Sequence, residues 1–318
     1  MRLPTLFLLC LQFCLVALAV GVPAPAFATQ CGVGGASLVF GPVDTLASIG
    51  TAASTDISIS CTEIPEGIEV VTICGHLGPG SGGASDGVRQ MQGSSDTLGF
   101  GLYADPGHQT SWGHESFPEL GEPLRLTLPV ADGAAGTTIT LHGLVHGAQA
   151  STVPGSYSAS IADTHASFAF DDGELANCTR EQGTETSISV SAEVQANCLV
   201  ETGDLNFGTV GVIDQNLDAI ADIAVSCTPG TAYSISLDGG VSGASQPDQR
   251  QLQSGSNSLT YGLYQDTERT VPWGEGAAVK PGEGIGGEES ISVYGRIPPQ
   301  PVAVGTYTDT VVVTVTYD

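Results

Sequence analysis

Residues 89–113 open with Arg89-Gln90-Met91-Gln92 and close with Trp112-Gly113. Residues 250–274 open with Arg250-Gln251-Leu252-Gln253 and close with Trp273-Gly274. Both stretches carry Gly-Leu-Tyr between these ends, with an aspartate two residues further on, so the second stretch repeats the first 161 residues later. Self-similarity at a fixed spacing indicates a duplicated structural unit. Two copies are too few to stack as a solenoid, so we expect two domains that each build their own core.

Alternation of apolar and polar residues predicts that both copies are built from strands. The segments Asp56–Cys61 and Asp222–Cys227 alternate in the same way, as do Leu98–Tyr103 and Leu259–Tyr264. The chain contains 43 Gly and 18 Pro, which are concentrated between these segments and are typical of turns. No segment shows a convincing amphipathic helical pattern. The sequence therefore predicts an all-β protein of two tandem immunoglobulin-like β-sandwiches.

The second copy has too few predicted strands to close such a sandwich. We expect strands near 199–208, 219–227, 231–238, 258–265, 290–297 and 306–317. An immunoglobulin-like sandwich has a seventh strand, and no alternating segment remains before Asp318. We therefore expect the C-terminal domain, residues 186–318, to lack its last strand. The exposed edge that results would be formed by Val311, Val313, Val315 and Tyr317.

An alternating segment at residues 187–196 joins the two copies. Its apolar face consists of Ile188, Val190, Ala192, Val194 and Ala196. One interpretation makes it the first strand of the second domain. The interpretation that we favour makes it the seventh strand of the N-terminal domain, residues 29–185, after which the chain continues into the second domain.

The N-terminus has the features of an export signal. An apolar run covers residues 6–20, and Ala26-Phe27-Ala28 is a cleavage site, so we expect residues 1–28 to be removed. No later apolar stretch could insert into a membrane. Six cysteines then remain in an exported chain, which favours disulfides.

The repeat indicates how four of these cysteines pair. Cys31 and Cys61 flank Phe40-Gly41 in the first copy, as Cys198 and Cys227 flank Phe207-Gly208 in the second. We therefore expect one disulfide in each domain, Cys31–Cys61 and Cys198–Cys227. Cys74 and Cys178 are left over in the first domain. Whether they pair stays open, because the predicted layout places them toward opposite ends of that domain.

The charge and the side-chain chemistry exclude several classes of function. Eight Lys and Arg face 34 Asp and Glu, which argues against nucleic acid and anionic membranes as partners. All six histidines lie in the first copy; His142 and His146 share a strand face but would stand ~13 Å apart, so we expect no metal site. There is no G-x-S-x-G elbow and no phosphate-binding loop. We expect neither an enzyme nor a cofactor.

The second copy closely resembles the spore coat U (SCPU) domain, and the first copy resembles it more loosely. The residues that carry the resemblance in residues 197–318 are Cys198, Leu205-Asn206-Phe207-Gly208, Val225-Ser226-Cys227-Thr228, Arg250-Gln251, Leu259–Tyr264, Trp273-Gly274, Tyr294-Gly295-Arg296 and Gly305–Thr310. Where the second copy has Tyr294-Gly295-Arg296, the first has His142-Gly143-Leu144, and its loops are longer.

The resemblance implies a function in pili of the archaic chaperone–usher type. Pilins of that family lack their last strand, and the next subunit supplies it from an N-terminal extension. Here only Thr29-Gln30 precede Cys31, so we expect no donor segment there and a subunit at the pilus tip. The implied partners are a periplasmic pilus chaperone, an outer-membrane usher and the adjacent pilin. The implied role is surface attachment and biofilm formation from the cell surface, after export through the periplasm.

The first domain would then be the binding head. If residues 187–196 run toward the second domain, loops 62–67, 104–138 and 171–186 lie at its far pole. We expect apolar residues of these loops to contact an abiotic or host surface, namely Ile64, Pro65, Phe117, Leu120, Leu124 and Val130. The alternative function is a stand-alone secreted protein that uses the same fold to bind carbohydrate or metal.

Overall fold

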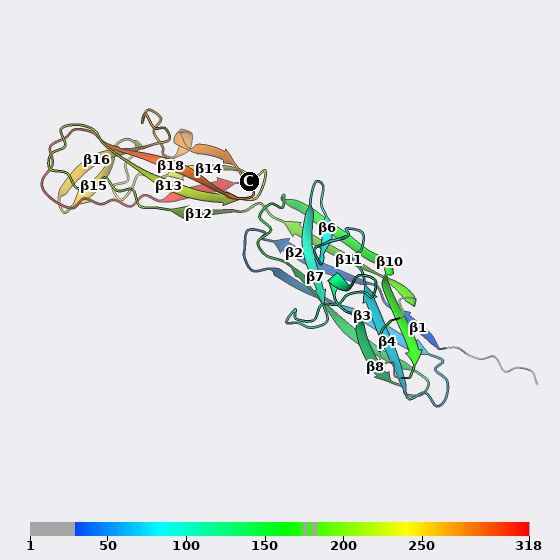
Figure 1. Cartoon of the computed structure of the whole chain (residues 1–318). Coiled ribbons are helices and arrows are strands. Elements are labelled where there is room, and N and C mark those ends of the chain that lie inside the picture. The colour runs from blue at the N-terminus through cyan, green and yellow to red at the C-terminus, as the bar shows by residue number, and fades with distance from the viewer. Residues whose placement is uncertain (1–28, 174–176, 180–182, 318) are drawn as a thin grey trace, which may run out of the picture.

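The computed structural model of the chain describes residues 29–173, 177–179 and 183–317, and the predicted export signal lies outside these ranges. Two β-structured bodies are joined end to end (Figure 1), and each has a separate hydrophobic core. The helical elements in the described ranges are two single 3₁₀ turns, η1 (Pro118–Leu120) and η2 (Gly276–Ala278). Within the same ranges no helix has the length and apolarity that crossing a membrane requires.

Domain one contains the first eleven strands. They are β1 (Gln30–Val33), β2 (Ala36–Val43), β3 (Thr51–Thr62), β4 (Val70–Leu77), β5 (Ala84–Ser85), β6 (Val88–Gln92), β7 (Thr97–Tyr103), β8 (Leu124–Pro129), β9 (Ala135–Val145), β10 (Gly155–Asp172) and β11 (Thr184–Val194). The strands follow the order β1-β3-β9-β7-β6-β10-β11-β2, and β4 joins β10 to β8. Their inward side chains surround one core, so β11 belongs to this body.

Domain two repeats this plan with fewer strands. They are β12 (Cys198–Thr202), β13 (Leu217–Cys227), β14 (Ala232–Leu237), β15 (Arg250–Ser254), β16 (Asn257–Tyr264), β17 (Lys280–Glu283), β18 (Glu288–Ile297) and β19 (Val313–Tyr317). One sheet has the order β12-β13-β18-β16-β15 and the other β17-β14-β19. Two expected strands are shorter than predicted, because residues 203–212 and 306–312 are not in strands.

The repeated sequence motif forms one buried unit in each domain. The guanidinium of Arg89 donates to the carbonyl oxygens of Leu77, Gly78 and Trp112, and that of Arg250 donates to those of Leu237, Asp238 and Trp273. Burial lowers the pKa of Arg89 to about 10. A buried cation is retained when hydrogen bonds satisfy it, so the fixed spacing from arginine to tryptophan reflects a structural unit.

Three disulfides cross-link the described residues. Cys31–Cys61 and Cys198–Cys227 each join two neighbouring strands, and they are the pairs that the repeat predicts. Cys74 also bonds to Cys178. The predicted layout set these two residues apart, but the connection from β10 to β11 brings Cys178 back beside β8, where its sulfur lies 4.0 Å from the carbonyl oxygen of Leu124. β8 is the neighbour of β4, which carries Cys74.

The two domains meet at a short junction, residues 195–197. The side-chain amide of Asn197 donates to Asp44 Oδ2 of domain one at 3.0 Å. The hydroxyl of Tyr317 in domain two donates to Asn197 Oδ1 at 3.2 Å. Asn197 therefore ties the end of β19 to domain one.

Candidate functional site

β11 fills a groove in the core of domain one. It pairs antiparallel with β10 and parallel with β2. Four alternate side chains of β11 are buried: Ile188, Val190, Ala192 and Val194. Ala196 lies beyond the end of the strand and is half-buried, so the inward face ends one alternate position earlier than the sequence predicts.

The walls of this groove have clear counterparts in domain two. A β-carbon added to Gly143 would lie 2.5 Å from Leu38 and 2.8 Å from Phe40, and one added to Gly295 would lie 2.9 Å from both Leu205 and Phe207. Phe40 packs edge-on against Phe100, as Phe207 does against Tyr261. Residues 203–210 therefore occupy the place of β2.

The other wall matches in the same way. Residues 155–161, Gly-Ser-Tyr-Ser-Ala-Ser-Ile, correspond to residues 305–311, Gly-Thr-Tyr-Thr-Asp-Thr-Val. Ser158 pairs with Gln92 in domain one, and Thr308 pairs with Gln253 in domain two. In domain one this wall is the first part of the continuous strand β10, whereas in domain two it is irregular until β19 begins.

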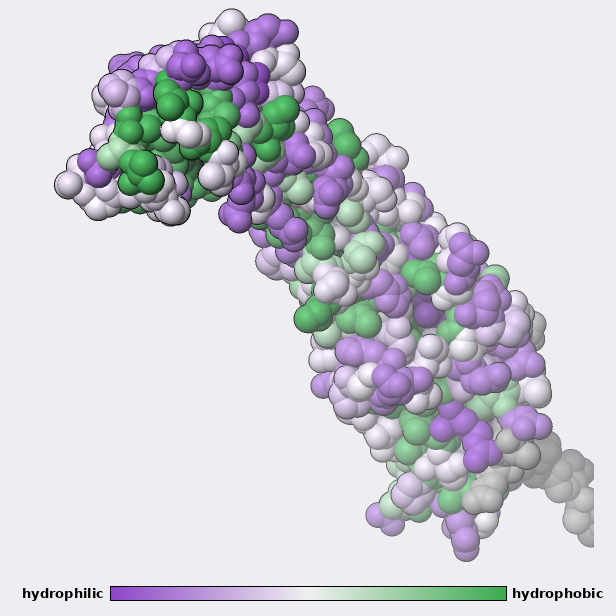
Figure 2. Space-filling view, turned by 60° about the vertical axis from the view of Figure 1, so that its left-hand side comes forward, coloured by the Kyte–Doolittle hydropathy of each residue, from purple (hydrophilic) through white to green (hydrophobic). Residues whose placement is uncertain are grey.

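No described residue takes the place of β11 in domain two, and the walls there are open. In domain one Leu38, Val43 and Ile161 are at most 2% exposed. Their counterparts Leu205 and Val311 are half-buried, and Val210 is 47% exposed. Exposed apolar residues nearby in the sequence include Val212, Val304 and Val312, and Figure 2 shows hydrophobic residues gathered on one face of domain two. Contiguous apolar surface of this kind indicates an interaction site.

β19 forms the free edge of the smaller sheet. Among the described strands it pairs with β14 alone, and Val313, Val315 and Tyr317 lie opposite Leu237, Ile235 and Tyr233. Val313 and Val315 pack half-buried against the core, and Tyr317 is exposed. Val311, which the sequence also predicts at this edge, precedes the strand and is likewise half-buried. An unpaired edge beside an apolar core can accept another strand.

A carboxylate lies in one wall of the open groove. Asp309 Oδ2 accepts a hydrogen bond from the hydroxyl of Tyr261 at 2.6 Å, and Oδ1 accepts from the backbone amides of Val241 and Thr310, both at 2.8 Å. Burial, and then the hydrogen bond to Asp309, raise the pKa of Tyr261. Asp309 is not among the site residues that we predict from the sequence, although an alignment of the two copies at Gly155 and Gly305 makes it the counterpart of Ala159.

The far end of domain one is only partly built as the sequence predicts. Loops 62–69 and 130–134 lie there, together with residues 171–173, because Thr62, Pro129 and Asp172 end strands at that pole. Residues 104–123 do not lie there. Tyr103 pairs with His142, three residues before the end of β9 that lies away from this pole, and Leu77, opposite the irregular middle of β10, donates its amide to Gly113. The loop with η1 therefore covers the side of the domain.

The structure corrects the list of apolar contact residues. Ile64 and Leu120 are buried, at 6% and 2% exposure, because each packs beneath its own loop. Leu124 and Val130 pack half-buried against the core. Phe117 is half-buried on the side of the domain, and Pro65 is the exposed residue of the set. Instead, the exposed side chains at the far end include four carboxylates, those of Glu63, Glu66, Glu69 and Asp132.

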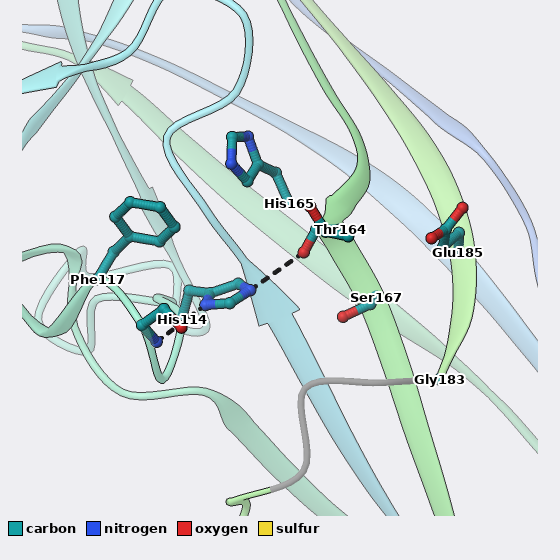
Figure 3. Close-up of a pocket in the computed structure, with 8 residues that line it drawn as sticks. His114, Phe117, Thr164, His165, Ser167, Gly183 and Glu185 are labelled. Carbon is teal, nitrogen blue, oxygen red and sulfur yellow. Dashed lines mark hydrogen bonds between the residues drawn. The ribbon is translucent and has the colours of Figure 1, made fainter.

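A hollow of about 500 Å³ lies on the side of domain one. Figure 3 shows His114 and Phe117 from the η1 loop facing His165 and Ser167 of β10, with Glu185 of β11 beyond them. His114 uses both ring nitrogens, one against the carbonyl oxygen of Thr164 and one against the amide of Ser116. In the part of the chain that the structure describes, no three His, Cys, Asp or Glu side chains are grouped to hold a metal ion.

The comparisons with known proteins agree with this description. The family model of the Spore Coat Protein U domain matches residues 16–164 and, again, residues 184–314. The chain belongs to the Spore Coat Protein U domain family. Protein U of Myxococcus xanthus is 32% identical over 167 residues, which is 47% of this chain and 90% of that protein. Membership of this family agrees with the expectation that the chain is not an enzyme.

Two solved structures were matched over 90% of the chain. One is the complex of CsuC with the tip adhesion subunit CsuE, a pre-assembly complex from archaic chaperone–usher Csu pili of Acinetobacter baumannii. The match covers 90% of this chain and 99% of that one, at 16% identity and a TM-score of 0.53. It confirms the expected fold class. The CupB6 tip adhesin of Pseudomonas aeruginosa covers 90% of this chain and 94% of its own at 14% identity, but a TM-score of 0.34 is too low to indicate the same arrangement.

Proposed function

We propose that this chain is the tip subunit of a pilus of the chaperone–usher type, and that it mediates surface attachment and biofilm formation. Domain two would accept a strand from the adjacent pilin, and domain one would be the binding head. The observation that carries the proposal is the pair of matched grooves. One groove is filled by β11, and the other is open in the described residues.

Several features support a place at the tip. The second family match begins at residue 184, so β11 precedes domain two in the chain as a donated strand would. However, its inward side chains are buried in domain one, and it is thus already used within the chain. β1 is also paired, with β3. The open groove of domain two is then the site through which this subunit would join the pilus.

The open groove also supports the partners that the resemblance implies. An apolar groove beside the free edge of β19 would aggregate unless it were covered, so a periplasmic pilus chaperone would hold it after export. An outer-membrane usher would then replace the chaperone with the strand of the adjacent pilin. The similar subunit CsuE is held by a chaperone in its pre-assembly complex, which supports this first step. The mature protein would reside at the cell surface.

Attachment to an abiotic or host surface would use the far end of domain one, because the other end contacts domain two. This end is rich in carboxylates and exposes Pro65, so its contacts would combine charge with small apolar areas. This differs from the apolar loops that the sequence predicts.

The experiment extends the mature chain beyond Asp318. In domain one a connection leads from the end of β10 back into β11, so a flexible Gly/Ser connector of about ten residues followed by a copy of residues 184–196 should fold back into domain two. A panel of three extensions carries Val, Ala or Ser at the position of Val190. A control extension exchanges the inward and outward residues.

At least one panel member should raise the unfolding midpoint of domain two and keep the chain monomeric. Burying two branched side chains, or three in the Val member, contributes on the order of 3–9 kcal/mol. The proposal fails if no panel member differs from the control. It also fails if the unextended chain is monomeric, with domain two as stable as domain one, which is the outcome that a stand-alone carbohydrate- or metal-binding protein predicts.

A further inference from the structure

The filled groove of domain one shows which wall residues flank each inward side chain of the inserted strand. Val190 lies opposite Ala159 of β10 and beside Leu38 of β2. Ile188 lies opposite Ile161 and beside Ala36. These two positions, the Val190 level and the Ile188 level, can be compared directly with domain two.

The walls of domain two differ from those of domain one most at the Val190 level. There Leu38 is matched by Leu205, but the small apolar Ala159 is matched by the carboxylate of Asp309. At the Ile188 level both substitutions are conservative in chemistry, from Ile161 to Val311 and from Ala36 to Gly203. The groove of domain two is thus apolar along the matched walls except at one level.

Asp309 is fixed in that place. Its carboxylate accepts three hydrogen bonds from groups of domain two, described above, and it attracts the buried guanidinium of Arg250, which opposes the effect of burial on the pKa of that arginine. Oδ2 has one partner, the hydroxyl of Tyr261, and Asp309 is half-buried while the groove is open. A strand that fills the groove would remove water from this oxygen.

The cost of removing that water depends on the incoming side chain. A valine offers no hydrogen bond to the carboxylate, and an acceptor left without a partner in a dry site is unfavourable. A serine or threonine hydroxyl can donate to Oδ2 in place of water. In domain one the same level holds Ala159, which requires no partner, and Val190 fits there.

We propose that Asp309 determines which strand domain two accepts. The adjacent subunit would present a small residue with a hydrogen-bond donor, serine or threonine, at the level that Val190 occupies in domain one. A copy of the chain's own β11 would be disfavoured, which would keep one tip subunit from adding to another. This inference rests on the proposed function, because it concerns the strand that the open groove accepts.

The experiment measures the affinity of the full mature chain for three labelled peptides. One copies residues 184–196, the second carries Val190→Ser, and the third carries Ile188→Ser as a control for polarity at another level. The Val190→Ser peptide should bind at least tenfold more tightly than the unchanged copy. The Ile188→Ser peptide should bind more weakly than the unchanged copy. Equal binding of the first two peptides would overturn the inference.

A protein variant tests the role of Asp309 itself. The double substitution Asp309→Ala with Tyr261→Phe recreates the pair Ala159 and Phe100, which domain one already accommodates. In this variant the unchanged copy should bind as tightly as the Val190→Ser peptide or more so. A preference for serine that persists in the variant would show that Asp309 is not the determinant. If no peptide bound to either protein, the open groove would not be an acceptor, and the proposed function would fail as well.

Discussion

The strand that joins the two domains provides a sharp test of how the chain is organised. Ile188 is completely buried between β10 and β2, opposite Ile161, which is completely buried too. Replacing a buried isoleucine with alanine typically costs 2–5 kcal/mol, because it removes packed methyl groups and leaves a cavity. We expect Ile188→Ala to destabilise domain one by about 3 kcal/mol, a value inside that range.

The assay uses the single tryptophan of each domain. Trp112 and Trp273 are both buried, so a Trp273→Phe background reports domain one and a Trp112→Phe background reports domain two. With a urea m-value of about 1–3 kcal/mol/M, the Trp112 transition should move down by roughly 1–3 M. Ser189→Ala is the matched control, since Ser189 is the exposed neighbour in the same strand, and it should shift the midpoint only slightly.

The result that refutes the reasoning is equally clear. If Ile188→Ala moved the Trp273 transition and left the Trp112 transition unchanged, residues 184–194 would belong to domain two. If neither transition moved more than it does in Ser189→Ala, β11 would not be packed in a core at all.

Three further predictions follow from the structure. Burial, and then the hydrogen bond to Glu289, raise the pKa of Tyr233 to about 12. The pKa values of Tyr157 and Tyr261 are also raised. A tyrosine whose pKa is raised in the folded state stabilises that state below pH ~10, and this stabilisation is lost as the pH rises toward 12. Circular dichroism during an alkaline titration should therefore show unfolding above pH 10, and Tyr233→Phe should reduce the loss of stability that comes from ionisation of Tyr233. An unchanged fold at pH 12 would contradict this prediction. Replacing Cys74 and Cys178 with serine opens a loop of 104 residues, and chain entropy predicts that the free energy of unfolding of domain one falls by about 4–5 kcal/mol. The loss should appear in the Trp112 transition. An equal shift of the Trp273 transition would show that the two domains unfold together. Replacing Glu63, Glu66 and Glu69 with glutamine should increase attachment of the mature protein to negatively charged glass at low salt, whereas the same number of changes at Asp214, Asp222 and Glu268 should not; equal effects would place the contact elsewhere.

The strand pattern and the duplication were readable from the sequence because alternation has a period of two wherever one face is buried. This is why the role of residues 187–196, the open edge near Val313 and the two repeated disulfides could be predicted. Residues 203–208 form the second half of a strand that the sequence predicts near 199–208, but the observed strand β12 ends at Thr202. They do not continue β12, because a strand needs a partner and the described residues provide none.

The loops of domain one could not be predicted in the same way. An apolar residue in a loop reads the same whether it points outward or packs beneath the loop, and Ile64 and Leu120 do the latter. The position of the η1 loop depends on the irregular middle of β10, where Asp163 adopts a φ of 54°. Nothing local in the sequence marks that irregularity, and it also determines where the connection carrying Cys178 returns.

The placement of β11 between β10 and β2 also determines how the molecule would carry tension. A pull between the far end of domain one and domain two acts along the axis of β11, since this strand continues directly into the junction at residues 195–197. The hydrogen bonds that β11 makes on its two sides lie across the direction of the pull, so they would be loaded together in shear and could not open one at a time. The strand that completes the fold of domain one thus also connects it to domain two, and separating the two under load would require the whole length of β11 to slide at once.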